Sequence, residues 1–108
     1  MASSPELDPT ASSHTVRLRI SGRVQGVGYR MWAVAKANRL GISGWVRNLT
    51  DGSVEALAHG EPEAVNSFIT ACQEGPSWGQ VSSVDVKAEA VPFEGVGFEQ
   101  HATSNPVE

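Results

Sequence analysis

Residues 15–40 pass from a strand pattern to a helix pattern across one glycine-rich loop. In residues 15–21, TVRLRIS, apolar and polar side chains alternate strictly, which predicts a strand with one buried face. Residues 29–40, YRMWAVAKANRL, lack Gly and Pro and are rich in alanine, which favours a helix that ends at Gly41. The side chains expected on its buried face are Tyr29, Ala33, Ala37 and Leu40.

Further strand and helix patterns follow at short intervals. Residues 42–49 predict a second strand, residues 50–52 a hairpin turn, and residues 53–59 a third strand. Pro62 begins a second helix, which ends at Gly75-Pro76. Residues 81–89 alternate as a fourth strand, and residues 97–100 predict a short edge strand. The apolar stripe of the second helix consists of Val65, Phe68, Ile69 and Cys72.

The element order β-α-β-β-α-β predicts an α+β fold, the ferredoxin-like split βαβ sandwich. Its antiparallel sheet carries two helices on one face. We expect a disordered N-terminal tail over residues 1–14, one domain over 15–101 and a C-terminal tail over 102–108. The first two strands are joined through a helix, so they run parallel and end at the same edge of the sheet. The glycine loop and Asn48 are therefore expected to lie close together.

Composition limits the partners and the compartment. Acidic residues outnumber basic ones by 12 to 8, for a formal net charge of −4, which argues against a nucleic-acid partner. No segment has the length and apolarity of a membrane span, and the N-terminus lacks the apolar core of a signal peptide. The single cysteine excludes an intrachain disulfide. We expect a cytoplasmic protein without a membrane partner, and its size and acidity favour a monomer.

Several residue types that often carry function are better explained by structure. His14, His59 and His101 are scattered, without a Cys or carboxylate cluster, so no metal site is expected. Cys72 lies in the apolar stripe of the second helix, which favours a core position. Three tryptophans, Trp32, Trp45 and Trp78, could form a stacking platform, but packing or partial exposure is the commoner explanation.

The loop GRVQGVGYR, residues 22–30, has the chemistry of an anion site. Glycines allow backbone N–H groups to converge at the start of a helix, where the helix dipole adds positive potential. Arg30 can add paired donors. The loop lacks the Gly-Lys-Ser/Thr of a nucleotide loop and the spacing of a dinucleotide fingerprint, and Val24 stands where cysteine phosphatases carry the nucleophile. An ordinary connection with a solvated arginine remains an alternative, as does simple turn chemistry for Asn48.

Two motifs together resemble the acylphosphatases: GRVQGVGYR and residues 40–56, LGISGWVRNLTDGSVEA. The resemblance extends over residues 16–100, although family members often carry Phe at the position of Tyr29. It implies metal-independent and cofactor-independent hydrolysis of a carboxyl-phosphate bond, with Arg30 binding phosphate and Asn48 orienting the attacking water. The residues that it implies for substrate binding are Arg23, Val24, Gln25, Gly26, Val27, Gly28 and Tyr29.

The implied substrate is a small-molecule acyl phosphate, and inorganic phosphate is both product and competing ligand. A carboxylate leaves readily, so the lack of a visible general acid in the sequence fits this substrate class. Two alternatives remain. One is a non-catalytic ferredoxin-like module that binds a ligand or RNA, which would need exposed aromatic side chains and a basic face on its sheet. The other is a role like that of the acylphosphatase-like domain at the start of large carbamoyl-transfer proteins.

Overall fold

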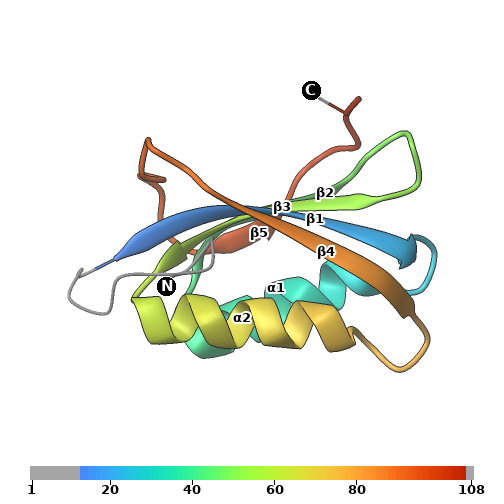
Figure 1. Cartoon of the computed structure of the whole chain (residues 1–108), viewed down its shortest axis with the longest axis horizontal. Helices are drawn as coiled ribbons and strands as arrows, with labels where there is room; N and C mark the ends of the chain where they lie inside the picture. Colours follow the sequence, from blue (N-terminus) through green and yellow to red (C-terminus); the bar gives the residue numbers. More distant parts are fainter. Residues whose placement is uncertain (1–12, 107–108) are drawn as a thin grey trace, which may run out of the picture.

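The computed structural model describes residues 13–106, so residues 1–12 of the expected N-terminal tail lie outside the described residues. The expected element order is confirmed, and the helix boundaries at 29–40 match the prediction (Figure 1). His14, which we assigned to the tail, is the first residue of β1. The elements are β1 (His14–Arg23), α1 (Tyr29–Leu40), β2 (Ser43–Asn48), β3 (Val54–Gly60), α2 (Pro62–Glu74), β4 (Gln80–Ala88) and β5 (Phe98–Gln100).

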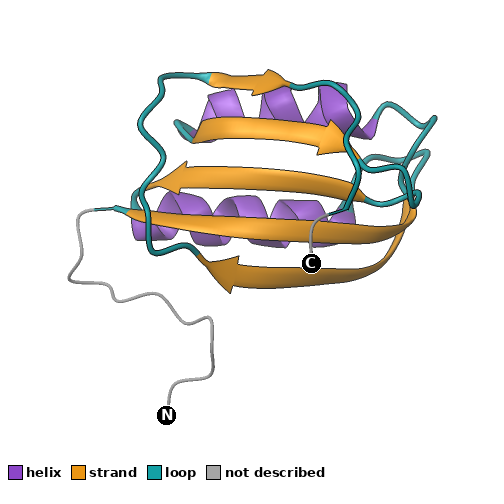
Figure 2. Cartoon of the chain, turned by 90° about the horizontal axis from the view of Figure 1, so that it is seen from above, coloured by secondary structure: helices purple, strands orange, loops and turns teal. Residues whose placement is uncertain are grey.

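The sheet is mixed, with the strand order β4-β1-β3-β2-β5 (Figure 2). The predicted antiparallel pairing holds for the first four strands, but β5 pairs with β2 in parallel. This difference follows from the path of the chain. β4 runs antiparallel to β2, so it finishes at the end of the sheet where β2 begins. The chain enters β5 from that end, and β5 therefore runs in the same direction as β2. The chain therefore leaves β5 at the end of the sheet where β1 and β2 also finish.

The core lies between the sheet and the two helices, which both cover the same face (Figure 1). Alternate side chains of β1, Val16, Leu18 and Ile20, are fully buried, as the sequence pattern predicted. Of the eight side chains predicted to lie on the buried faces of the two helices, six are buried. Leu40 and Ile69 are only partly buried and pack at the margin of the core. The six buried helical side chains are Tyr29, Ala33, Ala37, Val65, Phe68 and Cys72.

Tyr29 connects the start of α1 to the last turn of α2. Its ring is buried and its hydroxyl donates a 2.8 Å hydrogen bond to the carbonyl oxygen of Cys72. Carbonyl groups in the last turn of a helix lack intrahelical partners, so this bond satisfies a group that burial would otherwise leave unpaired. Burial raises the pKa of Tyr29 far above its usual value and that of Cys72 to about 12. The Cys72 thiol therefore stays protonated and is no nucleophile.

Tyr29→Phe should lower the melting temperature by about 4–8 °C, because it removes this hydrogen bond and leaves a buried carbonyl oxygen unpaired, at a cost of about 1 kcal/mol. A calorimetric melt measures the effect. Trp78→Phe is the matched control, since it deletes the polar atom of an aromatic side chain that is 82% exposed. Equal melting temperatures for Tyr29→Phe and the wild type would show that the contact contributes nothing to stability.

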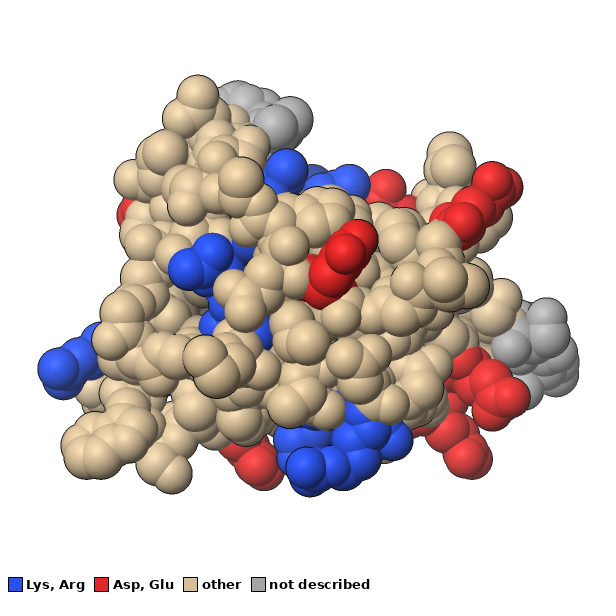
Figure 3. Space-filling model, turned by 180° about the vertical axis from the view of Figure 1, so that it is seen from behind, with Lys and Arg blue, Asp and Glu red and all other residues tan. Residues whose placement is uncertain are grey.

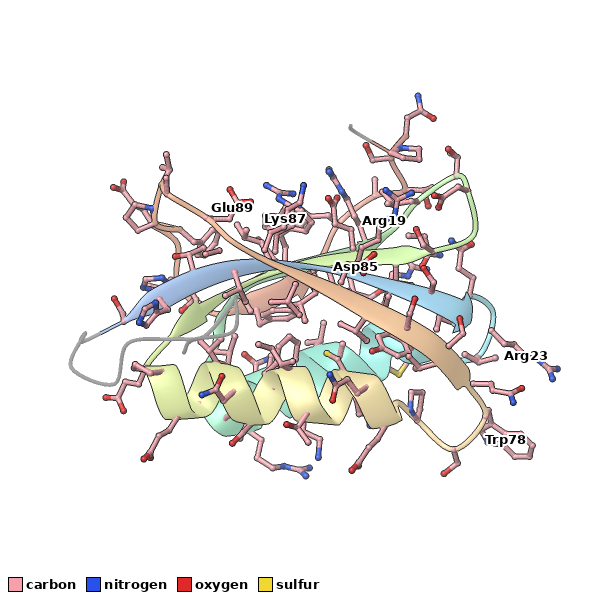
Figure 4. All side chains as sticks on the ribbon, in the orientation of Figure 1. Arg19, Arg23, Trp78, Asp85, Lys87 and Glu89 are labelled. Atoms are coloured by element: carbon pink, nitrogen blue, oxygen red, sulfur yellow. The ribbon has the colours of Figure 1, made fainter. Side chains whose placement is uncertain are left out.

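The helix-free face of the sheet carries paired charges. Arg17 contacts Glu55 at 3.0 Å and Glu89 at 2.9 Å, and Arg47 contacts Glu55 at 2.7 Å. Trp45 lies against both arginines, 4.6 Å from Arg47 and 5.6 Å from Arg17. Figure 4 shows further charged side chains, among them Asp85 and Lys87, on the same face. The Trp45 side chain therefore packs against the two arginines of this charged face.

The other two tryptophans differ in burial. Trp32 packs on Tyr29, with ring centroids 5.2 Å apart, whereas Trp78 projects from the loop between α2 and β4, beyond the end of the sheet near Arg23 (Figure 4).

Within residues 13–106, no helix has both the length and the apolarity that a bilayer crossing requires.

Candidate active site

The loop between β1 and α1 turns its backbone toward the start of the helix. Gly26 and Gly28 have φ angles of 76° and 81°, in the left-handed region that glycine adopts without strain. Gly28 is the N-cap of α1. No side chain among residues 13–106 caps the N-terminus of this helix, and its first turn contains no acidic residue. The N–H groups at this helix start therefore meet no competing carboxylate from the first turn. This backbone of residues 24–29, called the cradle below, has the form of an anion site.

Gly22 lies at an irregularity in the pairing of β1 with β4, one residue before β1 ends. The register between β1 and β4 shifts between Ser21 and Gly22. A Cβ at Gly22 would collide with the backbone of Gln80 and Ser82 in β4, so only glycine permits this close approach. The bulge thus shifts the register of β1 just before the cradle, and the pairing with β4 continues to Arg23, opposite Gln80.

Arg30 and Asn48 line one pocket together with the glycines of the cradle. Arg30 lies in the first turn of α1, and Asn48 is the last residue of β2. The prediction that the glycine loop and Asn48 lie close together is therefore confirmed. The pocket has a volume of about 160 Å³, which is small compared with sites for drug-sized ligands. Its lining consists of Val24, Gly26, Gly28, Tyr29, Arg30, Met31, Asn48 and Gln100.

The electrostatics of this end favour an anion. Arg17 and Arg19 pair with carboxylates, Arg19 with Asp51. Among residues 13–106, Arg23 and Arg30 have no carboxylate partner within ion-pair distance. Figure 3, which views the molecule from the side of α1 and β5, shows basic side chains beside a hollow at its left end and most acidic side chains at its right. The unpaired positive charge of Arg30 adds to that of the helix N-terminus.

Three of the residues expected to bind substrate, Arg23, Gln25 and Val27, do not line the pocket, although the backbone of Gln25 and Val27 belongs to the cradle. Arg23 is exposed at the end of β1, and Val27 packs against the core; neither lines the pocket. The side chain of Gln25 points to the hairpin, where its Nε2 donates to the carbonyl oxygens of Leu49 at 2.7 Å and Ser53 at 2.8 Å. Gln25 thus connects the cradle to the backbone that follows Asn48. No pattern in the sequence indicated these two hydrogen bonds, which span 24 and 28 residues.

The hairpin turn is itself held by Asp51. Its Oδ1 accepts hydrogen bonds from the Ser53 hydroxyl at 2.6 Å and the Ser53 N–H at 3.0 Å. These two bonds, with a smaller contribution from Arg19, lower the pKa of Asp51 to about 2. The carboxylate is therefore ionised, and the turn intact, throughout the neutral pH range.

Met31 and Gln100 line the pocket but were missed by sequence reasoning. Met31 is 70% exposed and follows Arg30 directly. Gln100 pairs with Val46 of β2, two residues before Asn48, so its position depends on the parallel register of β5.

Within residues 13–106, no group of three His, Cys, Asp or Glu side chains is arranged to hold a metal ion.

Comparisons with known proteins agree with this geometry. The acylphosphatase family model matches residues 16–100. An acylphosphatase of Azoarcus sp. (strain BH72) is 49% identical over 92 residues, which cover 85% of this chain and 93% of that protein. The solved acylphosphatase of Coxiella burnetii superposes with a TM-score of 0.80 at 32% identity, covering 83% of this chain and 94% of that one. For the acylphosphatase of Bacillus subtilis the TM-score is 0.78 at 33% identity, with 81% and 97% covered.

The chain therefore belongs to the acylphosphatase family, as its two motifs indicated, and its activity is that of an acylphosphatase. The ferredoxin-like fold is confirmed by the same structures. This result sets aside the non-catalytic binding module that the fold alone left open.

Proposed function

We propose that this acylphosphatase hydrolyses the carboxyl-phosphate bond of small acyl phosphates in the pocket between the cradle and Asn48. The observation that carries the proposal is that the cradle glycines, Arg30 and Asn48 line one pocket at the N-terminus of α1. The phosphoryl oxygens accept hydrogen bonds from the cradle N–H groups and from the guanidinium of Arg30. Arg23, exposed at the start of the loop, adds positive charge that attracts the anion.

Asn48 has a different task in this mechanism. Its side-chain amide holds a water molecule on the side of the phosphorus away from the leaving carboxylate. Water attacks phosphorus, the bond to the acyl oxygen breaks, and the products are a carboxylate and inorganic phosphate. Phosphoryl transfer of this kind depends on positioning and on charge stabilisation rather than on a covalent intermediate. No strong general acid is needed, because the carboxylate is a stable leaving group.

We further propose that the enzyme needs no metal or other cofactor, because the cradle and Arg30 supply the positive charge that a metal would otherwise provide. Inorganic phosphate, which has the head group of the substrate, competes for the same pocket. We propose a monomer that acts in the cytoplasm, in line with the small domain and its single, buried cysteine.

A substrate panel tests this function. Benzoyl phosphate and acetyl phosphate should be cleaved far faster than alkyl phosphate monoesters, because the pocket offers no acid for a poor leaving group. EDTA should leave the rates unchanged. Comparable rates on both substrate classes would contradict the mechanism. Loss of activity in EDTA, with recovery on adding a divalent ion, would contradict metal independence.

A further inference from the structure

Residues 101–106 continue past β5 and dock beside the backbone of Asn48. We expected a tail from residue 102, and the family model ends at residue 100. The structure instead shows a parallel bridge between Leu49 and Ser104. Figure 2 shows the chain leaving β5 and passing over the end of the sheet where β2 finishes. Ser104 therefore makes this contact from outside the range of residues that the family model matches.

Backbone hydrogen bonds of Ser104 enclose the residue after Asn48. The Ser104 N–H donates to the carbonyl oxygen of Asn48 at 3.1 Å, and the Thr50 N–H donates to the carbonyl oxygen of Ser104 at 3.0 Å. Before these, the His101 N–H donates to Val46 at 2.8 Å. On this edge of β2, β5 proper ends opposite Val46. Of the residues the structure describes, Ser104 alone therefore supplies a backbone partner to this side of Asn48 and Thr50.

The other sides of this backbone are held by different elements. Asn48 pairs with Val54 of β3, and the Leu49 N–H donates to Ser53 at 2.9 Å. Gln25 binds the Leu49 carbonyl oxygen from the cradle. The Asn48 side chain makes no hydrogen bond to another residue within 13–106. No hydrogen bond to a described residue holds its amide group, so the backbone determines the point from which this side chain extends into the pocket.

We propose that the 101–106 segment, through the backbone of Ser104, positions Asn48 for the attacking water; this inference rests on the proposed role of Asn48. An error of about 1 Å in the placement of a reacting group can lower a rate about 100-fold. The segment adds little to the core, since Ala102, Thr103 and Asn105 are exposed. Its loss should therefore affect the water-positioning side of the pocket more than the fold.

Ser104→Pro tests the proposal, because proline lacks the N–H that binds Asn48. We expect kcat for benzoyl phosphate to fall about 10-fold or more, while phosphate affinity, measured by calorimetry, stays within about three-fold. Ser104→Ala keeps the backbone N–H of residue 104, so its kcat should equal that of the wild type. Thr103→Pro is the matched control, since the N–H of this neighbouring residue has no partner among the described residues. A circular dichroism melt shows whether each variant is folded at the assay temperature.

A double variant separates positioning from a general structural effect. If Ser104 acts through Asn48, adding Ser104→Pro to Asn48→Ala should lower kcat by no more than about two-fold beyond Asn48→Ala alone. An equal loss in both backgrounds would overturn the proposal, and so would an unchanged kcat for Ser104→Pro. A parallel loss of phosphate affinity would also overturn it. Full kcat for Asn48→Ala would instead contradict the proposed role of Asn48 itself.

Discussion

Arg30→Ala should weaken the binding of inorganic phosphate roughly 10- to 150-fold, the equivalent of a charge-assisted contact of about 1.5–3 kcal/mol. The guanidinium is proposed to touch the phosphoryl oxygens before and during the reaction, so turnover of acyl phosphate should fall as well. Calorimetric titration with phosphate and steady-state kinetics measure the two effects. Arg30→Lys should recover only part of the affinity, because an ammonium group cannot donate two parallel hydrogen bonds.

The same variant should be no less stable than the wild type when phosphate is absent. Arg30 lies at the positive end of α1, where a cation is unfavourable, and alanine is the better helix former. Phosphate should raise the melting temperature of the wild type and raise that of Arg30→Ala much less. Arg39→Ala is the matched control, since it removes the same charge from the exposed last turn of α1. Normal phosphate binding by Arg30→Ala would show that the assigned contact does not exist.

Asn48→Ala should lower kcat about 100-fold while phosphate affinity stays within a few-fold of the wild type. The difference from Arg30 has a physical reason. Asn48 is proposed to hold only the water, whose bond to phosphorus forms on the way to the transition state, so its loss leaves the binding of product unaffected. Steady-state kinetics with benzoyl phosphate and a phosphate titration of the same preparation measure both quantities.

Asn66→Ala provides the comparison for Asn48→Ala, because Asn66 is exposed on α2, away from the pocket lining. It should change neither kcat nor phosphate affinity. Full kcat in Asn48→Ala would contradict the water-positioning role. A large loss of phosphate affinity would assign Asn48 to phosphate binding instead.

The parts of this molecule that could be predicted are those with strong local patterns. The boundaries of α1 follow from Gly28 and Gly41, which permit the left-handed backbone at each end of the helix. The burial of alternate residues in β1 follows from strict alternation. The meeting of the cradle with Asn48 is less local, yet it follows from the parallel direction of two strands joined through a helix.

The contacts that the sequence did not reveal join distant segments through the backbone. β5 has only three residues, too few for a periodic pattern to indicate its parallel register or the place of Gln100. The contacts of Gln25 and Ser104 involve backbone carbonyl and N–H groups, which nearly all residue types carry, so neither residue's side-chain type identifies its partner. The C-terminal segment was assigned to a tail for the same reason: its polar, exposed residues carry no core pattern.

The central claim, that the cradle binds the phosphoryl group, is tested most directly by a phosphate titration followed through the backbone amide resonances of the ¹⁵N-labelled protein. The account predicts that the largest, saturable shifts fall on residues 24–30, whose N–H groups lie around the start of α1. Saturable shifts that gather instead around Arg47 and Lys87 on the helix-free face, with the cradle resonances unmoved, would contradict it.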